Sequence, residues 1–197
     1  MKTFALEGKS REIAASSADQ KRALSALRKN AQVPAVLYGG ESVVHFSVDF
    51  DAVRTLIYTP EVYLVELAIG GTKKMAVLKD LQFQPVTDDL LHIDFQEIFA
   101  DKPVVIEVPV ALSGYAEGVK AGGKLILRMR KLKVKALYKH LPEKLVINID
   151  SLGLGKSMQI GELSFENMEL MSAKNAVVCA VQLTRAARGA AAAAAGK

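Results

Sequence analysis

The sequence predicts a mostly β protein with short helices, divided into two domains. Short apolar runs with the alternation typical of strands follow one another along most of the 197 residues. Glycine and proline clusters separate these runs, as they do in turns between strands. Helix signals are confined to residues 17–31 and to the segment between Asp49 and Pro60. In the first domain, many strands at short spacing favour a small closed or nearly closed barrel.

The segment 17–31 is expected to form a basic amphipathic helix. Ser17 can cap its N-terminus, and Gln20 follows at the spacing of a capping box. At about 100° per residue, the basic side chains fall within an arc of roughly 120°, while Leu24 and Leu27 fall opposite and are expected to face the core. The basic residues are Lys21, Arg22, Arg28 and Lys29.

The other elements of the first domain, residues 1–99, are strands and one short helix. Asp49 can begin this helix, and Pro60, which cannot continue it, ends it. Residues 62–69 and 74–81 are expected to pair as a hairpin through the four-residue connection GGTK. The strands are expected at 3–8, 33–40, 43–48, 62–69, 74–81 and 90–98, with a turn at 85–89 before the last.

The second domain is expected over residues 100–184, after the boundary segment FADKP at 99–103. It has strand signals, no strong helix and a glycine-rich connection at 114–123, so it is predicted to be all β or mostly β. The alanine-rich tail, 185–197, is short and has no apolar partner face, so disorder is expected there. The strands are expected at 104–112, 125–138, 144–149, 158–160 and 175–183.

Within the second domain, the segment KLILRMRKLKVKALYK (124–139) changes the face of its apolar residues part-way along. Alternate residues of a strand share a face, so a straight strand would bury one set of charges. We therefore expect a bulge or bend near Arg130–Lys131 that leaves a row of cations on one side. Such a row would suit a nucleic-acid backbone, although an edge strand guarded by lysines explains it equally well. The candidate contacts are Arg128, Arg130, Lys131 and Lys133.

The formal net charge of +5 is unevenly distributed along the chain. Residues 1–40 carry seven basic and three acidic residues, residues 41–99 four and ten, and residues 100–150 ten and five. A polyanion would be attracted to the two basic zones rather than to the whole molecule. No apolar run is long enough for a membrane span, and the first residues lack the apolar core of a signal peptide, so a cytoplasmic protein is expected.

No catalytic, metal or cofactor site is predicted. The single cysteine, Cys179, lies in an apolar string and is expected to be a buried, inert thiol. The three histidines lack metal-ligand spacing, and the glycines of 114–123 lack the spacing of a phosphate loop. Acidic residues near the end of the first domain are better explained as a solvated strand edge than as paired catalytic carboxylates. They are Asp88, Asp89, Asp94 and Glu97.

Basic clusters remain as the features that could carry a function. The cations of the 17–31 helix, with Lys9 and Arg11 before them, could bind phosphates because a rigid element aims them in one direction. A solvated helix face is an equally good interpretation of the same residues.

The motifs resemble a known family. A basic helix, then VPAVLYG (33–39), then VLKDLQFQPVTDDLLHIDFQEI (77–98) resembles the bacterial large-subunit ribosomal protein twenty-five family, which binds 5S rRNA. The second half resembles the C-terminal extension of the long form, the general stress protein Ctc type. Its matching stretches are 108–125, 130–137 and 141–163. The resemblance covers the chain up to about Thr184.

The resemblance implies an N-terminal six-stranded β-barrel that binds 5S rRNA, followed by a C-terminal mostly-β domain. The family uses basic residues of the N-terminal segment and helix, and polar residues on the barrel face. Carried onto this chain, the basic residues are Lys9, Arg11, Lys21, Arg22 and Arg28, with Lys29 beside them on the helix face. The polar residues are Gln82 and His92, which suit base edges and 2′-hydroxyls in a shallow minor groove.

Two positions depart from the family pattern. Family members usually have glycines around the helix and before VPAVLYG, so Asn30 is expected to supply the left-handed conformation here. Phe83 stands where the family often has a basic residue beside Gln82. A phosphate contact would then be absent there, or replaced by stacking on an exposed base.

These observations predict a structural, non-enzymatic component of the large ribosomal subunit that binds 5S rRNA. It is expected to be a monomer within the ribosome, without a cofactor, metal or membrane, and its second domain would reach neighbouring RNA and proteins. The alternative is a general or stress-related RNA-binding protein that is only partly ribosome-bound. An enzyme acting on a nucleotide or acidic substrate lacks an assembled site.

Overall fold

The computed structural model describes residues 2–13 and 16–184. The alanine-rich tail, for which disorder was predicted, lies outside the described residues. The chain divides into two compact units, one of Met1–Ile106 with Leu137–Lys139, the other of Glu107–Ala136 with His140–Lys197. No helix in the described part of the chain is long and apolar enough to span a membrane.

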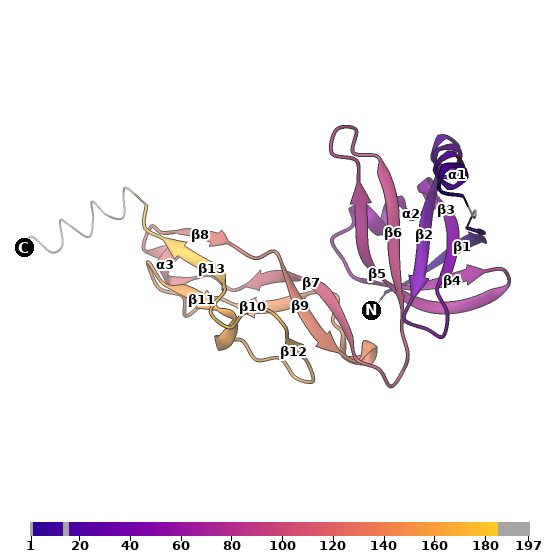
Figure 1. The fold of residues 1–197 in the computed structure, drawn as a ribbon. Helices are drawn as coiled ribbons and strands as arrows, with labels where there is room; N and C mark the ends of the chain where they lie inside the picture. The colour runs from indigo at the N-terminus through magenta and orange to yellow at the C-terminus, as the bar shows by residue number, and fades with distance from the viewer. Residues whose placement is uncertain (1, 14–15, 185–197) are drawn as a thin grey trace, which may run out of the picture. The chain divides into compact units, whose positions relative to one another are not determined.

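The first unit contains a closed six-stranded barrel with the strand order β1-β3-β2-β6-β5-β4 (Figure 1), which confirms the predicted barrel. β1 runs parallel to β4 and β2 runs parallel to β6, while the other neighbouring strands are antiparallel. Closure leaves the barrel without an unpaired edge. The strands are β1 (Lys2–Ser10), β2 (Gln32–Tyr38), β3 (Val44–Asp49), β4 (Tyr63–Ile69), β5 (Thr72–Phe83) and β6 (Leu90–Glu97).

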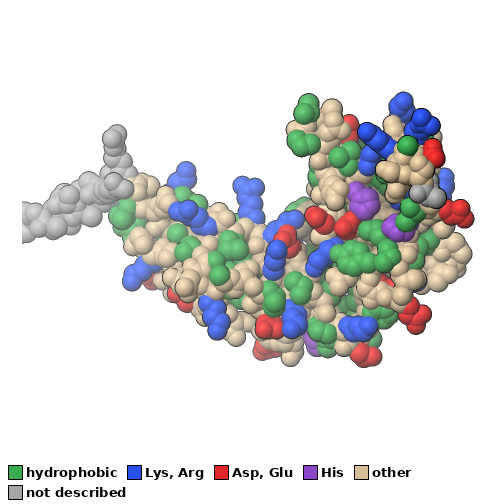
Figure 2. All heavy atoms as spheres, in the orientation of Figure 1, with side chains coloured by type: hydrophobic (Ala, Val, Ile, Leu, Met, Phe, Trp, Pro, Cys, Tyr) green, Lys and Arg blue, Asp and Glu red, His purple; other side chains and the backbone are tan. Residues whose placement is uncertain are grey.

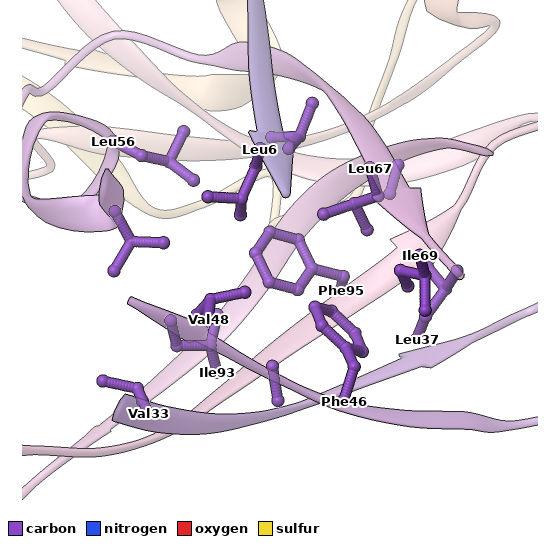
Figure 3. Close-up of a cluster of buried hydrophobic side chains, with 14 of the residues drawn as sticks. Leu6, Val33, Leu37, Phe46, Val48, Leu56, Leu67, Ile69, Ile93 and Phe95 are labelled. Carbon is purple, nitrogen blue, oxygen red and sulfur yellow. The ribbon is translucent and has the colours of Figure 1, made fainter. Parts of the chain in front are cut away.

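The barrel interior is filled by one side of each strand. Phe46 of β3 and Phe95 of β6 are fully buried, and their ring centroids lie 5.9 Å apart at the centre of this core (Figure 3). Around them pack leucines, valines and isoleucines from all six strands. Because successive residues of a strand alternate between faces, the inward Ile93 and Phe95 place His92 and Asp94 on the outer face of β6.

The hairpin between β4 and β5 is tighter than the sequence predicted. Ile69 pairs with Thr72, so the connection consists of Gly70 and Gly71 alone. Both glycines have positive φ, +55° and +85°, as a two-residue turn that matches the twist of the strands requires. The predicted four-residue connection is wrong because Thr72 and Lys73 already belong to the strand pairing.

Helix α1 (Ser17–Lys29) begins with Ser16 as its N-cap, not with Ser17. No side-chain hydrogen bond caps it, so the predicted capping box with Gln20 is wrong, and only the backbone N–H of Gln20 donates to the Ser16 carbonyl. The second helix, α2 (Phe50–Tyr58), follows Asp49 and ends before Pro60, as predicted.

The left-handed residue after α1 is Ala31, with φ of +55°. Asn30, which was expected to take this conformation, has φ of −91°. The prediction failed by one position. The turn is nevertheless of the expected kind, since a residue with positive φ redirects the chain from the helix into β2.

The second unit is mostly β, as predicted, and holds two small sheets. Their strand orders are β10-β7-β9-β12 and β11-β13-β8. The glycine-rich connection includes a four-residue helix, α3 (Glu117–Lys120). The strands are β7 (Val104–Ser113), β8 (Lys124–Leu127), β9 (Lys131–Ala136), β10 (Leu145–Asn148), β11 (Ser157–Gln159), β12 (Glu169–Leu170) and β13 (Val177–Gln182).

The predicted bend in 124–139 is present as a complete strand break. Residues 128–130 link β8 in one sheet to β9 in the other. Leu132 and Val134 are buried after the break, while Arg128 and Arg130 are exposed. The two-residue β12 pairs with β9 at Val134 and Lys135, so that part of β9 is not a free edge, whereas β8 is the edge strand of its sheet.

Glycines of the 114–123 connection serve close packing. A Cβ atom on Gly118 would lie 2.6 Å from the carbonyl carbon of Gly153, and one on Gly123 would lie 2.4 Å from a methyl group of Val181. The same core holds Cys179, which is fully buried, and burial raises the pKa of its thiol. The prediction of a buried cysteine is therefore confirmed.

Candidate nucleic-acid interface

Gln82 and His92 lie side by side on the outside of the barrel. They are direct cross-strand partners in the antiparallel pair β5–β6. Partners of this kind project from the same face of the sheet. The structure therefore brings together the two polar residues that the family resemblance singled out, although they are ten positions apart in the sequence.

Asp94 holds the ring of His92. Its carboxylate oxygen Oδ1 lies 2.6 Å from Nδ1 of the histidine, and both side chains are half-buried. A carboxylate accepts hydrogen bonds, so Nδ1 is the donor in this contact, and in the tautomer with one proton this leaves Nε2 as an acceptor. An acceptor in this position can meet a 2′-hydroxyl or a base amino group in a minor groove.

The face around His92 is acidic rather than basic. Asp80 of β5 is the cross-strand partner of Asp94. Burial raises the pKa of the nearby Tyr38, and the charges of Asp94 and Asp80 raise it further, so its hydroxyl remains a donor. Carboxylates repel phosphates but accept hydrogen bonds from base amino groups and 2′-hydroxyls. The face therefore suits groove edges better than a phosphate backbone.

Lys9 and Arg11 belong to a different part of the barrel wall, next to β3. Lys9 of β1 is the cross-strand partner of Ser47 in β3. The backbone N–H of Arg11 donates to the carbonyl of His45, at 2.9 Å. In the barrel order, β3 and β2 lie between β1 and β6, so the N-terminal cations are not on strands adjacent to His92.

The cations of α1 are all exposed and face two different ways. Arg22 makes an exposed ion pair with Asp19, at 3.8 Å. Arg28 instead turns towards β6, where its Nε and Nη2 atoms donate to the carbonyl of Leu91 at 3.3 and 3.0 Å. This intramolecular bond occupies a side chain that was predicted to contact RNA.

A groove of about 630 Å³ lies between α1 and the β5–β6 hairpin. Figure 2 shows basic side chains over α1 and histidine side chains on the hollowed surface between the helix and the hairpin. Lys21, Arg28 and Lys29 line the groove on the helix side, and Gln84 and Asp89 line it on the hairpin side. The helix cations and the end of the β5–β6 hairpin are thus the two walls of one groove, and Gln82 and His92 lie on the same two strands just beyond its lining.

The tip of the β5–β6 hairpin carries exposed apolar side chains. Val86 is 88% exposed and Phe83 is 38% exposed. The turn is fixed by backbone bonds between Gln84 and Asp89 and between Asp88 and Gln84, with Asp88 at φ +56°. An aromatic ring exposed beside Gln82 can stack on a base.

Comparison with known proteins decides the family. The family model described as Ribosomal L25p family matches residues 6–95, and the one described as Ribosomal protein TL5, C-terminal domain, matches residues 103–185. A protein of Parabacteroides distasonis named large ribosomal subunit protein bL25 is 71% identical over 190 residues, which cover 96% of this chain and 98% of the relative. The chain belongs to the ribosomal L25p family.

Two further relatives carry the same name. The protein of Bacteroides fragilis is 61% identical over 194 residues, covering 98% of this chain and 99% of the relative. That of Porphyromonas gingivalis is 60% identical over 193 residues, covering 97% and 98%. The resemblance found in the sequence is confirmed, with the TL5 type of C-terminal domain. Membership in a ribosomal L25p family also confirms the expectation of a non-enzymatic protein of the cytoplasmic ribosome.

The TL5-type domain of this L25p chain carries the second set of predicted contacts. Arg128 and Arg130 are exposed on the link between the two sheets, and Lys131 and Lys133 are exposed on β9. Lys133 lies 3.8 Å from a carboxylate oxygen of Glu107 on the neighbouring strand. Acidic neighbours weaken the field of the lysines on β9, so the two arginines are the stronger anion-binding candidates.

Sequence reasoning missed three features of the L25p barrel surface. Asp94 was assigned to a solvated edge, although a His-x-Asp spacing on a strand places both side chains on one face and could have revealed the pair. Tyr38 gave no signal because it comes from a distant strand. Val86 gave no signal because a lone apolar residue in a turn is ordinary.

Among the described residues, no group of three His, Cys, Asp or Glu side chains could hold a metal ion.

Proposed function

We propose that this chain is a structural component of the large ribosomal subunit that binds 5S rRNA through its first unit. The observation that carries the proposal is the pair of Gln82 and His92, with Asp94 bonded to the histidine, on the two strands whose connecting hairpin borders the groove beside α1. Membership in the ribosomal L25p family supports the ribosomal assignment. The 5S rRNA assignment rests on the family resemblance and on the chemistry of this surface.

Two kinds of side chain on this surface would bind different groups of the RNA. Exposed lysines and arginines bind phosphates and release counterions, which gives affinity that falls with salt. The Gln82–His92 pair reads hydroxyls and base edges in a wide, shallow minor groove, which gives recognition of RNA shape. A folded RNA that presents a groove and its flanking phosphates together would engage both parts at once.

The proposal is tested by equilibrium titration of the full chain with 5S rRNA and with a size-matched control RNA at equal salt. We expect 5S rRNA to bind about 100-fold more tightly, a difference of about 2.7 kcal/mol. Sedimentation with large subunits then tests ribosomal association, which should remain stoichiometric at physiological salt. Equal affinity for the two RNAs would overturn the 5S assignment. Poor association with subunits would favour a general RNA-binding protein that is only partly ribosome-bound.

A further inference from the structure

Helix α1 is weakly anchored to the rest of the first unit. None of its 13 residues is buried, although its leucines were expected to lie in the core. Leu24 and Leu27 are only half-buried against the barrel. The helix continues into β2 through Ala31, whose left-handed backbone costs about 1 kcal/mol or more in a residue other than glycine. Core packing therefore does little to fix the direction in which α1 holds its cations.

The side chain of Arg28 connects α1 to the β5–β6 hairpin. The guanidinium of Arg28 donates two hydrogen bonds to the carbonyl of Leu91, a residue 63 positions away in the sequence. Leu91 directly precedes His92 on β6. The tether therefore joins the cationic wall of the groove to β6, the strand that carries His92.

The carbonyl that Arg28 uses lies at an irregularity of the β5–β6 ladder. Gln82 pairs with His92 and Phe83 pairs with Leu90, so the register shifts and Leu91 has no cross-strand partner in β5. Bulges of this kind disrupt the ladder locally and redirect side chains next to functional sites. Arg28 thus bonds to the carbonyl of the one residue that the shifted register leaves without a partner between Leu90 and His92.

We infer that Arg28 is a positioning residue that makes the surface specific for its folded RNA. This inference rests on the proposed function. Arg28 acts through the lysines of α1 and through His92: it holds the two walls of the groove at the separation that one RNA fold requires. We assign it to positioning rather than to a phosphate, because Nε and Nη2 of its guanidinium donate to the carbonyl of Leu91, which fixes the side chain against β6.

The two roles predict different responses to salt. A phosphate contact releases counterions, so its removal lowers the salt slope by about one unit and weakens binding to every RNA alike. A tether releases none. Its removal leaves the salt slope and the binding of unrelated RNA unchanged. It weakens only the binding of an RNA that must contact both walls of the groove together.

The test compares R28Q with K21Q as a matched control, since each replaces one exposed cation of α1 by a neutral side chain. For R28Q we expect about tenfold weaker binding of 5S rRNA, as for the loss of one charge-assisted hydrogen-bonding group, and unchanged binding of the control RNA with an unchanged salt slope. For K21Q we expect the affinity for both RNAs to fall by the same factor, and the salt slope to become shallower by about one unit.

Amide hydrogen exchange of the RNA-free chain tests the tether itself. Protection in residues 17–29 should fall in R28Q and stay unchanged in K21Q, while protection of the barrel strands stays unchanged in both. The inference is overturned if R28Q reproduces the RNA-binding behaviour of K21Q, or if helix protection is equal in the two variants. Should the unmodified chain fail to discriminate between the RNAs, the proposed function fails, and the exchange experiment still decides whether Arg28 anchors the helix.

Discussion

Ala31 holds a conformation that glycine would adopt at lower cost. Its φ of +55° lies in the left-handed region, and its carbonyl accepts a hydrogen bond from the N–H of Phe50 at 2.9 Å. The left-handed conformation costs about 1–2 kcal/mol for alanine, and glycine avoids this cost. Glycine's greater freedom in the unfolded chain offsets about 0.5–1 kcal/mol of that gain in stability. We predict that Ala31→Gly raises the free energy of unfolding by about 0.5–1 kcal/mol, measured by urea denaturation.

The control for this prediction is Ala26→Gly, at an exposed position inside α1. Glycine there should destabilise the chain by up to about 1 kcal/mol, because the position is helical and gains nothing from positive φ. The prediction requires that the two substitutions change the free energy of unfolding in opposite directions. Destabilisation by both would show that Ala31 is not strained.

Asp94 makes the second prediction at the residue scale. Asp94→Asn keeps the shape of the side chain but removes the charge that fixes the tautomer and direction of His92. We expect binding of 5S rRNA to weaken about fivefold, or about 1 kcal/mol. Binding of a control RNA should stay equal or strengthen, because one repulsive carboxylate is gone. A parallel loss for both RNAs would mean that Asp94 supports the fold rather than the recognition of RNA.

At the scale of elements, the sequence predicted which segments form the barrel but not how each one packs. The strand predicted at 90–98 is present as β6, because apolar and polar residues alternate along a half-buried strand. For α1 the amphipathic pattern was present, yet its leucines are not buried. The interior of the barrel is filled by its own strands and by α2, so a second helix finds no further core to enter.

The exposed face of α1 supports a prediction on salt dependence. Lys21→Ala combined with Arg22→Ala should weaken RNA binding and make its salt slope shallower by roughly one or two units. Stability should change little, since the ion pair of Arg22 with Asp19 is exposed and 3.8 Å long. A titration over several salt concentrations measures the slope. An unchanged slope would remove these residues from the interface.

The strand break at 128–130 supports a prediction for the second unit. Arg128→Ala combined with Arg130→Ala should leave the affinity for isolated 5S rRNA unchanged, because the first unit is proposed to make that contact. Association with large ribosomal subunits, followed by sedimentation at increasing salt, should be lost at lower salt than for the unmodified chain. If the variant and the unmodified chain leave the subunit at the same salt concentration, these arginines do not contact the subunit.

For the whole molecule, strand signals on either side of residues 99–103 predicted two β units, and the family resemblance assigned RNA binding to the first. The pairing of distant strands in the second unit, such as β8 with β13 and β7 with β10, could not be predicted. Strand alternation reports which side of a strand is buried and carries little information about its neighbour. The tether from Arg28 to Leu91 was hidden for the same reason, since it depends on where two distant segments meet.

The most direct test of the account is amide hydrogen exchange of the full chain, with and without saturating 5S rRNA. The account predicts new protection in α1 and in the β5–β6 hairpin, residues 17–29 and 79–94, with the strands of the second unit unchanged. Protection confined to the second unit, or absent from both walls of the groove, would contradict it.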